Sequence, residues 1–537
     1  MHDAAQQRDP ERDRNGLVWY VEKPNQKFLF ACGERYVWET LPPGTRIVEA
    51  PPSVPGLADP DAAIEAALEH PLGCDPLSAQ LRPGMKVTIA FDDLSLPLPP
   101  MQRPDVRQRV IEIVLRKLAA AGIDDIHLIV ATSLHRRMTK AELQHALGRR
   151  IVRAFYPHRL YNHDAENPDG IVALGKTEQG EVVELNRRAV ESDLLIYVNI
   201  NLVSMDGGNK SVPVGLGTYA SLRFHHNVHS LMQSRSFMDP RHSYLHHSCD
   251  RMGRVVAEHV KIFTIETTLN GDMFPWFMTF LNKTEKHYTA FDRLSLHATR
   301  GFLDHSPLAV NRRLFQAIKS PYQLSGVHAG ETNAVHAKTM EQVFKQHLVR
   351  VEGQADIVVM GLAHICPYNV NSIMNPILVM CLGLGYMFNF YRGRPLGRKG
   401  GVMIFLHPVE YKFNAVHHPS YIDFFEEVLT ETQDSSVIEA KYEESYARNP
   451  RYLEAYRFGH AYHGVHPFYM WYWGTQGQRH FARVIFVNPT SPQAVRRMGF
   501  EAAPSLPAAL EMARDTLGAN ASITYQRVPP ISMCEVV

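Results

Sequence analysis

Apolar runs of strand length alternate with helical and looped segments along the middle of the chain. Residues 87–90, 126–131 and 194–200 are apolar and rich in β-branched side chains, as in buried strands. Between the first two runs the pattern predicts a helix from Arg103 to Ala121, ended by Gly122. This β-α-β order predicts a mostly parallel sheet with helices on its faces.

The same patterning continues toward the C-terminus. Thr139 and Glu142 are spaced as a capping box, which predicts a helix ending near Gly148, and residues 170–174 form another strand-like run. After a polar, mainly helical stretch, a second α/β half is predicted by strands at 355–361, 401–406, 483–487 and 521–525 and by a helix at 505–517.

We therefore expect two α/β domains with mostly parallel sheets and the active site in the cleft between them. Residues 1–80 have Pro and Gly punctuation and little periodicity, and are expected to form an extension packed on the first domain. The first domain is expected at 81–330 and the second at 331–500. Residues 501–537 are expected to pack back on the first domain.

Composition narrows the class of partner. The chain has 537 residues, of which 45% are apolar and 21% charged, as in globular proteins with more than one core. Lys plus Arg number 56 against 55 for Asp plus Glu, which gives no electrostatic case for a nucleic acid or an anionic membrane. The most apolar run, 377–387, is too short to span a bilayer. We expect a small-molecule substrate.

Cysteine usage and the N-terminus bear on the compartment. The 6 cysteines are scattered without a C-x-x-C pair, as expected for free thiols in a reducing environment. Residues 1–14 are polar and charged, unlike a secretory signal peptide. A cytoplasmic location is therefore expected.

Polar side chains follow the first two predicted strands where each strand ends. Asp92 and Asp93 come after the first, and His135 and Arg136 after the second. Taken singly, the carboxylates could cap a turn and the histidine could belong to a solvated helix start. Because ligands bind beyond the carboxyl ends of parallel strands, we expect these loops to share one rim and to form a site.

The third loop, after residues 194–200, contains Gly207, Gly208 and Lys210. Adjacent glycines allow positive φ angles and close approach of a ligand, and the lysine can reach into the space they leave. His225 and His226 follow. The residue types indicate an anionic ligand, a lysine and a possible histidine metal ligand, with an ordinary Gly-rich turn beside surface histidines as the alternative.

Five motifs follow one another in order over residues 86–230. They are Phe91-Asp92-Asp93 with the prolines of 97–100; Ala131 to Arg136 with the capping box; Asn162-His163-Asp164-Ala165; Leu174 to Gly180; and Gly207-Gly208-Asn209-Lys210 followed by His226. In this order and spacing the sequence resembles the nickel-dependent lactate racemases and their 2-hydroxyacid racemase and epimerase relatives. The resemblance is weaker but continuous to about residue 527.

The resemblance implies a cofactor and roles for these residues. Lys210 would hold a nickel-pincer pyridinium mononucleotide covalently, and His226 would supply the remaining nickel ligand. Asp92, Asp93, Gly207, Gly208 and Arg136 would contact the cofactor, as the site residues of a cofactor-binding first domain. In the family the cofactor accepts a hydride from the hydroxyl-bearing carbon while a histidine removes the hydroxyl proton. His135 would be that base, and cofactor-maturation enzymes would be partners.

The sequence departs from the family at the substrate. The second histidine base of the family, ten positions before the lysine, falls on Ile200, and the arginine that holds the substrate carboxylate falls on Leu96. The substrate-facing Tyr-Gln and Lys of the second domain fall near Ile373, Met374 and Ile377. A substrate other than lactate is therefore expected, because each lost charge-assisted hydrogen bond is worth about 1.5–3 kcal/mol.

Three functions compete at this point. The first is a nickel-pincer-dependent racemase or epimerase, an isomerase, in which His225, a water held by Asn199 or Asn201, or a second-domain histidine such as His364 replaces the missing base. The second is a non-catalytic or cofactor-carrying relative. The third is a nicotinamide-dependent dehydrogenase, which is disfavoured because no G-x-G-x-x-G follows the first strand.

Overall fold

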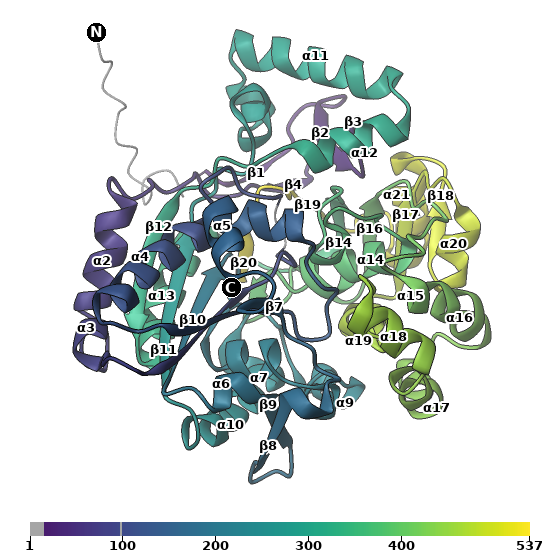
Figure 1. Cartoon of the computed structure of the whole chain (residues 1–537). Helices are drawn as coiled ribbons and strands as arrows, with labels where there is room; N and C mark the ends of the chain where they lie inside the picture. Colours follow the sequence, from purple (N-terminus) through teal and green to yellow (C-terminus); the bar gives the residue numbers. More distant parts are fainter. Residues whose placement is uncertain (1–15, 97–98) are drawn as a thin grey trace, which may run out of the picture.

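The computed structural model describes residues 16–96 and 99–537 (Figure 1). The polar N-terminus that argued against a signal peptide lies outside the described residues, as do the first two residues of the proline-rich stretch 97–100.

The first α/β half is built on a six-stranded sheet with the order β12-β11-β10-β5-β6-β7. Its strands are β5 (Lys86–Asp92), β6 (Asp125–Ala131), β7 (Leu160–Asn162), β10 (Leu194–Asn201), β11 (Ile262–Leu269) and β12 (Leu324–Gly330). All neighbours are parallel except β12, which runs antiparallel to β11. Every residue of β10 is buried, which explains its uninterrupted apolar pattern.

Helices enclose this sheet. They are α2 (Pro60–Glu69), α3 (Leu77–Gln80), α4 (Val106–Ala120), α5 (Lys140–Phe155), α6 (Arg187–Val190), α7 (Ser211–Gly215), α8 (Tyr219–Leu222), α9 (Val228–Gln233), α10 (Tyr244–Ala257) and α13 (Thr332–His347). The capping box of Thr139 and Glu142 is confirmed at the start of α5. Gly148, with φ of 79°, interrupts the helical geometry where the sequence predicted an end, and a further helical stretch follows it.

The second half contains a seven-stranded sheet with the order β1-β4-β19-β14-β16-β17-β18. Its strands are β1 (Val18–Tyr20), β4 (Arg46–Val48), β14 (Ala355–Gly361), β16 (Gly397–Leu406), β17 (Arg483–Val487), β18 (Glu501–Ala503) and β19 (Ile523–Gln526). Only β1 is antiparallel to its neighbour. A smaller parallel sheet joins β13 (Leu348–Val351), β20 (Met533–Val536) and β15 (Tyr391–Arg392).

The helices of the second half lie on and between these sheets. They are α14 (Pro376–Met380), which continues through η7 (Cys381–Met387), α15 (Pro419–Asp423), η8 (Phe424–Val428), α16 (Leu429–Glu431), α17 (Ser435–Ala447), α18 (Pro450–Phe458), α19 (His466–His480), α20 (Pro492–Arg497) and α21 (Leu506–Leu517). Among the described residues, no helix combines the length and the apolar character needed to cross a membrane.

Both ends of the chain are placed differently from our expectation. Strands β1 and β4 join the second sheet, whereas α2 packs on the first half and β3 contacts α11, within residues 81–330. Residues 501–537 likewise complete the second half, through β18, β19 and β20. Strands of both segments thus pair in the second half, because short strands take their partners from distant residues that local pattern does not reveal. Other residues of the same segments contact residues 81–330, as Arg527 does through Glu285.

The run at 170–174 was also assigned to the wrong sheet. It forms β8 (Ile171–Lys176), which pairs antiparallel with β9 (Val182–Asn186) in a separate hairpin. The strand is largely exposed, so it needs no partner in the buried sheet. A second hairpin, β2 (Lys27–Cys32) with β3 (Arg35–Thr40), lies beside α11 (Ala290–His305) and α12 (Leu308–Ala317) at the top of Figure 1.

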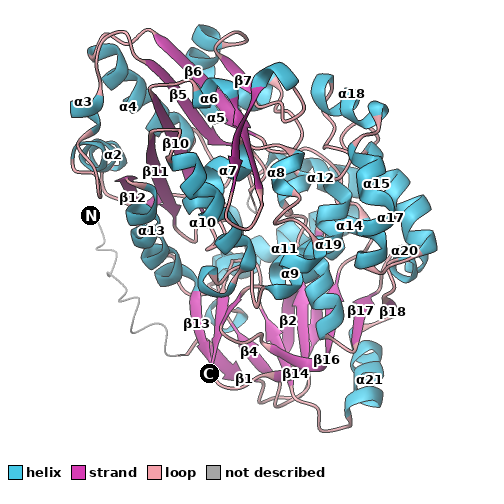
Figure 2. Ribbon diagram, turned by 90° about the horizontal axis from the view of Figure 1, so that it is seen from below, coloured by secondary structure: helices cyan, strands magenta, loops and turns pink. Residues whose placement is uncertain are grey.

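The two halves share one continuous hydrophobic core. Buried side chains of β5, β6 and β10 belong to the same packed cluster as those of α14, η7 and α19. Figure 2 shows the two sheets apart from each other, with helical segments including α14 and α19 between them. The carboxyl ends of the first sheet therefore face the helices of the second half.

Candidate active site

The three loops expected to share a rim do so. One cavity is lined by residues from the ends of β5, β6 and β10, and its lining includes Asp92, Asp93, His135, Asn199, Gly207 and Lys210. The cause is the parallel register, in which Asp92 pairs with Ala131 and β10 runs alongside β5. The grouping predicted from strand ends is confirmed.

Asp93 orients His135. Its Oδ2 lies 3.0 Å from Nδ1 of His135, and its Oδ1 accepts a hydrogen bond of 2.8 Å from the Ser95 backbone N–H. A carboxylate at Nδ1 favours the tautomer that has its proton there, which leaves Nε2 with a free lone pair. Asp93 therefore orients the His135 ring and sets its tautomer. The sequence did not distinguish this role from that of Asp92.

Asp92 is held by the end of β10. Its Oδ2 accepts the Ile200 backbone N–H at 2.7 Å, and both oxygens accept from Nδ2 of Asn199 at 3.1 and 3.2 Å. Burial raises the pKa of Asp92 to about 7, although the Ile200 hydrogen bond opposes that shift. Asp92 can therefore carry a proton near neutral pH.

The Gly207-Gly208 turn requires glycine at both positions. Their φ angles are 83° and 60°, in the left-handed region. A Cβ on Gly207 would overlap Asn201 and Glu266, and one on Gly208 would come within 2.9 Å of His336. Glu266 also accepts the Gly208 N–H at 2.6 Å. Asn201, Glu266 and His336 thus pack tightly against the turn. This packing fixes the backbone from which the Lys210 side chain extends.

Lys210 lines the cavity with its side chain only 19% exposed. Its Nζ lies 3.9 Å from Oδ1 of Asp206, which is too long for a hydrogen bond. The amine is therefore held near a carboxylate but keeps its donors and, once deprotonated, its lone pair for a ligand.

His225 and His226 lie back to back. Their Nδ1 atoms are 2.6 Å apart, while Nε2 of His225 is buried without a hydrogen-bond partner. Burial, together with the positive charges of His225, Lys210 and His135, holds the pKa of His226 well below its usual range. The His226 ring is therefore neutral at neutral pH, as a metal ligand must be.

The second half closes the site with aromatic side chains. Tyr368 and His466 lie against His135, with ring centroids 5.2 and 5.4 Å away, and Tyr469 and Trp473 lie against His226 at 5.2 and 5.6 Å. The Tyr469 hydroxyl, Trp473 Nε1 and His466 Nε2 are buried without partners. Buried polar atoms are usually paired, so their clustering here indicates a site built for a ligand with polar groups.

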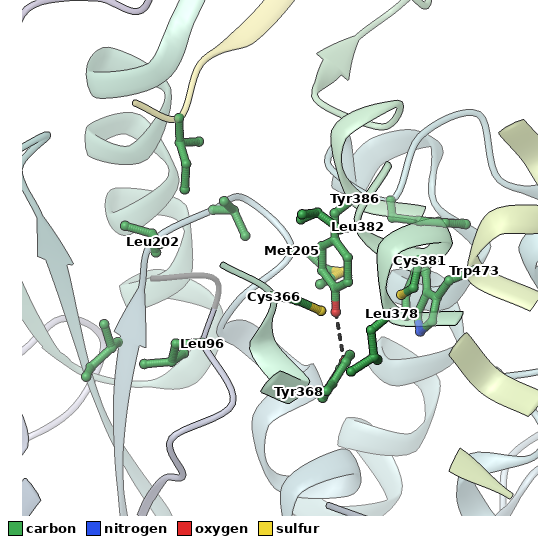
Figure 3. Close-up of a cluster of buried hydrophobic side chains, with 14 of the residues drawn as sticks. Leu96, Leu202, Met205, Cys366, Tyr368, Leu378, Cys381, Leu382, Tyr386 and Trp473 are labelled. Carbon is green, nitrogen blue, oxygen red and sulfur yellow. Dashed lines mark hydrogen bonds between the residues drawn. The ribbon is translucent and has the colours of Figure 1, made fainter. Parts of the chain in front are cut away.

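Apolar side chains occupy the rest of this region. Leu96 and Leu202 of the first half face Cys366, Tyr368 and Tyr386 of the second in Figure 3, and the Tyr368 and Tyr386 hydroxyls are hydrogen-bonded at 2.8 Å. Sequence reasoning missed this wall, because α19 reaches the site only through packing between the halves. A signal in the sequence is the series His460, His463 and His466, whose spacing is not diagnostic of a metal site.

Comparison with known proteins finds similarity to lactate racemases. Residues 34–239 match the lactate racemase N-terminal domain. The lactate racemase of Lactiplantibacillus plantarum is 28% identical over 169 residues, which are 30% of this chain and 38% of that protein. The lactate racemase of Thermoanaerobacterium thermosaccharolyticum is 25% identical over 167 residues, 30% of this chain and 37% of that protein. Over residues 34–239 this chain is thus similar to the N-terminal domain of lactate racemases.

The fold is shared over nearly the whole chain. The lactate racemase apoprotein from Thermoanaerobacterium thermosaccharolyticum superposes with a TM-score of 0.62 at 17% identity, covering 95% of this chain and 100% of that one. The sequence alignments span little more than a third of either relative's length. The resemblance in sequence is thus concentrated in the first half, where the loops of the cavity lie.

Two residues expected at the family's site lie elsewhere. Arg136 pairs with Glu142, its Nη2 2.6 Å from Oε1, and donates to the Val370 carbonyl of the second half at 3.1 Å, so it joins the halves and does not line the cavity of the described residues. His364 lies 3.2 Å from Glu34, which also pairs with Arg312 at 2.8 Å. The cofactor contact of Arg136 stays a prediction, and His364 lies beside Glu34 outside the described lining of this cavity.

The residues His225, His226 and Lys210 fit a cofactor whose own atoms supply most of the metal ligands. Within the described ranges no three His, Cys, Asp or Glu side chains are grouped so as to hold a metal ion among themselves. A metal at His226 would therefore need most of its ligands from a bound organic group. The neutral His226, the available Lys210 amine and the unpartnered His225 Nε2 suit such a group.

Proposed function

We propose that this protein is a nickel-pincer-nucleotide-dependent racemase or epimerase that acts at a hydroxyl-bearing carbon of a substrate other than lactate. The observation that carries the proposal is the Asp93–His135 pair, at 3.0 Å, beside Lys210 in one cavity. Oxidation of a hydroxyl-bearing carbon and return of the hydride to it require an oriented base next to a lysine that anchors the cofactor.

Lys210 and His226 would hold the cofactor. The Lys210 amine is placed by the Gly207-Gly208 turn for covalent attachment, and the neutral His226 ring offers nitrogen to nickel. Asp92, Gly207 and Gly208 line or shape the same space. When bound, the cofactor supplies a hydride acceptor that returns the hydride to either face of the carbon.

His135 would move the hydroxyl proton. Its Nε2 takes the proton while Nδ1–H stays on Asp93, so that the imidazolium formed is neutralised by a carboxylate 3.0 Å away. The aromatic side chains of the second half exclude water from this exchange.

The substrate would have an apolar substituent and would not depend on a carboxylate clamp. Among the described residues, the lining of the cavity includes Lys210 but no arginine that could bind a carboxylate through two hydrogen bonds. Leu96, where the family has its arginine, is 8% exposed. Because Leu96 faces the aromatic wall in Figure 3, a hydroxy compound with an alkyl or aryl group suits the site.

Cofactor loading tests the proposal. The chain is co-expressed with cofactor-maturation enzymes, and intact mass and metal content are measured for the wild type, Lys210→Ala and His226→Ala, with the exposed Lys176→Ala as control. We expect an adduct on the Lys210 peptide, its loss in Lys210→Ala, and reduced nickel in a folded His226→Ala. An adduct that persists in Lys210→Ala, or a wild type without adduct or nickel, would overturn the assignment.

A non-catalytic, cofactor-carrying relative is the second candidate. It is favoured by Ile200, whose side chain is fully buried where the family has a histidine base. A loaded protein that inverts no hydroxy compound of a broad panel would support it.

A further inference from the structure

We propose that His466, held by Tyr421, is the second proton-carrying group of this site and takes the place that Ile200 cannot fill; this rests on the proposed function. His466 begins α19, so it comes from the opposite half of the molecule to His135. The two histidines, His135 and His466, thus come from different halves of the molecule.

The His466 ring is anchored on one side and free on the other. Its Nδ1 lies 2.6 Å from the Tyr421 hydroxyl, whereas Nε2 is buried with no hydrogen-bond partner. His135 has the same arrangement, with Nδ1 on Asp93. Each ring therefore has one nitrogen fixed by a neighbour and the other available to a ligand.

His466 lies among the aromatic side chains with which the second half closes the site. Its ring centroid lies 5.4 Å from that of His135, 4.6 Å from Tyr368 and 4.4 Å from Tyr462. It is 2% exposed. A fully buried imidazole nitrogen without a partner costs about 1–3 kcal/mol unless a ligand satisfies it, so its retention beside His135 points to a ligand there.

Tyr421 lets His466 act in both directions. A phenol can accept a proton from Nδ1 or donate one to it, and burial raises the pKa of Tyr421 well above its usual range, so the hydroxyl keeps its proton. When Nδ1–H points to the Tyr421 oxygen, Nε2 has a lone pair for the substrate hydroxyl proton. Burial and the neighbouring histidines hold the pKa of His466 well below its usual value, so the lone pair is free at neutral pH.

The proton and electrons balance with the proposed chemistry. For one enantiomer, Nε2 of His466 forms an N–H bond as the substrate O–H bond breaks, while the carbon-bound hydrogen leaves with its electron pair to the cofactor. The product at this stage is the 2-oxo compound. His135, which begins this direction as the imidazolium, gives its Nε2 proton to the oxygen as the hydride returns to the opposite face. The turnover leaves His466 protonated and His135 neutral, which is the starting state for the other enantiomer.

Single-turnover oxidation of each enantiomer tests the pair. Because a racemase with one base removed is slowed in both overall directions, the half-reaction is measured instead, by quenching loaded enzyme with each enantiomer of 3-phenyllactate and counting the 2-oxo acid formed. We expect the wild type to oxidise both, His466→Gln to lose at least about 100-fold on one, and His135→Gln to lose as much on the other.

Two further variants separate chemistry from folding. Tyr421→Phe keeps the ring and removes only the hydrogen bond, so it should slow the enantiomer that depends on His466 by about 10-fold. His460→Gln changes a histidine of the same segment whose Nδ1 is bonded to the Arg137 carbonyl at 3.1 Å, and it should behave as wild type.

The outcomes are distinct. A loaded His466→Gln that oxidises both enantiomers at the wild-type rate would overturn the role of His466 and leave the proposed function standing. Equal losses for both enantiomers in His466→Gln and Tyr421→Phe would show a structural role only. A loaded wild type that oxidises neither enantiomer of 3-phenyllactate, mandelate, 2-hydroxybutyrate or the uncharged amides of these acids would overturn the proposed function and the inference with it.

Discussion

Oδ2 of Asp93 lies 3.0 Å from Nδ1 of His135, and this contact decides which nitrogen of the imidazole faces the cavity. Asp93→Asn keeps the shape but can present an N–H to Nδ1 and invert the tautomer. Turnover is expected to fall by two decades or more, with adduct mass and nickel content unchanged, because a wrongly protonated ring cannot act as the base. Unchanged turnover in a loaded Asp93→Asn would show that His135 is not the base.

The tight packing under the glycine turn predicts an asymmetric response to alanine. Gly208→Ala adds a Cβ within 2.9 Å of His336 at a φ of 60°, whereas Gly180 has a φ of 82° with nothing within 4 Å. Both variants incur the left-handed backbone penalty of about 1 kcal/mol, so the difference between them isolates the clash. Thermal unfolding should give a lower Tm for Gly208→Ala than for Gly180→Ala, together with a lower yield of the Lys210 adduct. Equal Tm values would show that the loop moves freely.

Asp92 makes stability depend on pH. Its carboxyl has a folded pKa of about 7, above the unfolded value of 3.8. Between these values the unfolded state ionises and the folded state does not, so this group lowers stability as pH rises from about 4 to 7, with a slope that cannot exceed about 1.4 kcal/mol per pH unit. Below pH 4 and above pH 7 its contribution is constant.

Urea unfolding of wild type and Asp92→Asn from pH 4 to 8 measures this contribution. The difference in unfolding free energy should shift in favour of the variant as pH rises, and then level off. Taking the difference removes Glu443, whose pKa burial also raises to about 7. A pH-independent difference would mean that Asp92 is ionised throughout.

Leu96→Arg tests the substrate assignment. Leu96 lines the cavity beside Asp92 and Asp93, and an arginine there would restore a bidentate partner for a carboxylate. Turnover of lactate by the loaded variant should rise by about 10-fold or more over wild type, while that of uncharged hydroxy compounds should fall. A wild type that already racemises lactate efficiently would refute the inferred substrate class.

Much of the first half could be predicted from sequence because its signals are local. The largely apolar β10, the capping box of Thr139 and Glu142 and the break at Gly148 each act within a few residues. The meeting of Asp93, His135 and Lys210 followed from one further rule, that parallel strands end on one edge. The similarity to lactate racemases rested on these same loops.

The parts that escaped prediction depend on distant packing. His466 reaches His135 because α19 packs against η7 and the core between the halves, and no spacing near His466 encodes that contact. Arg136 looked like a ligand for an anion, but its two terminal nitrogens already donate to Glu142, six residues away, and Nη2 also donates to the Val370 carbonyl. The local sequence pattern identified side chains that can bind a ligand or transfer a proton. It could not show which of them already pair with other residues of the protein.

The insertion of β19 between β4 and β14 has a consequence for synthesis on the ribosome. Thr524 pairs with Arg46, a separation of 478 residues, so β4 has only β1 as a neighbour in the sheet until the last part of the chain has emerged. The six-stranded sheet needs only residues 86–330 and can form earlier. During most of translation, the edge of β4 that later pairs with β19 therefore remains unpaired. The second half closes over the cavity in the final step.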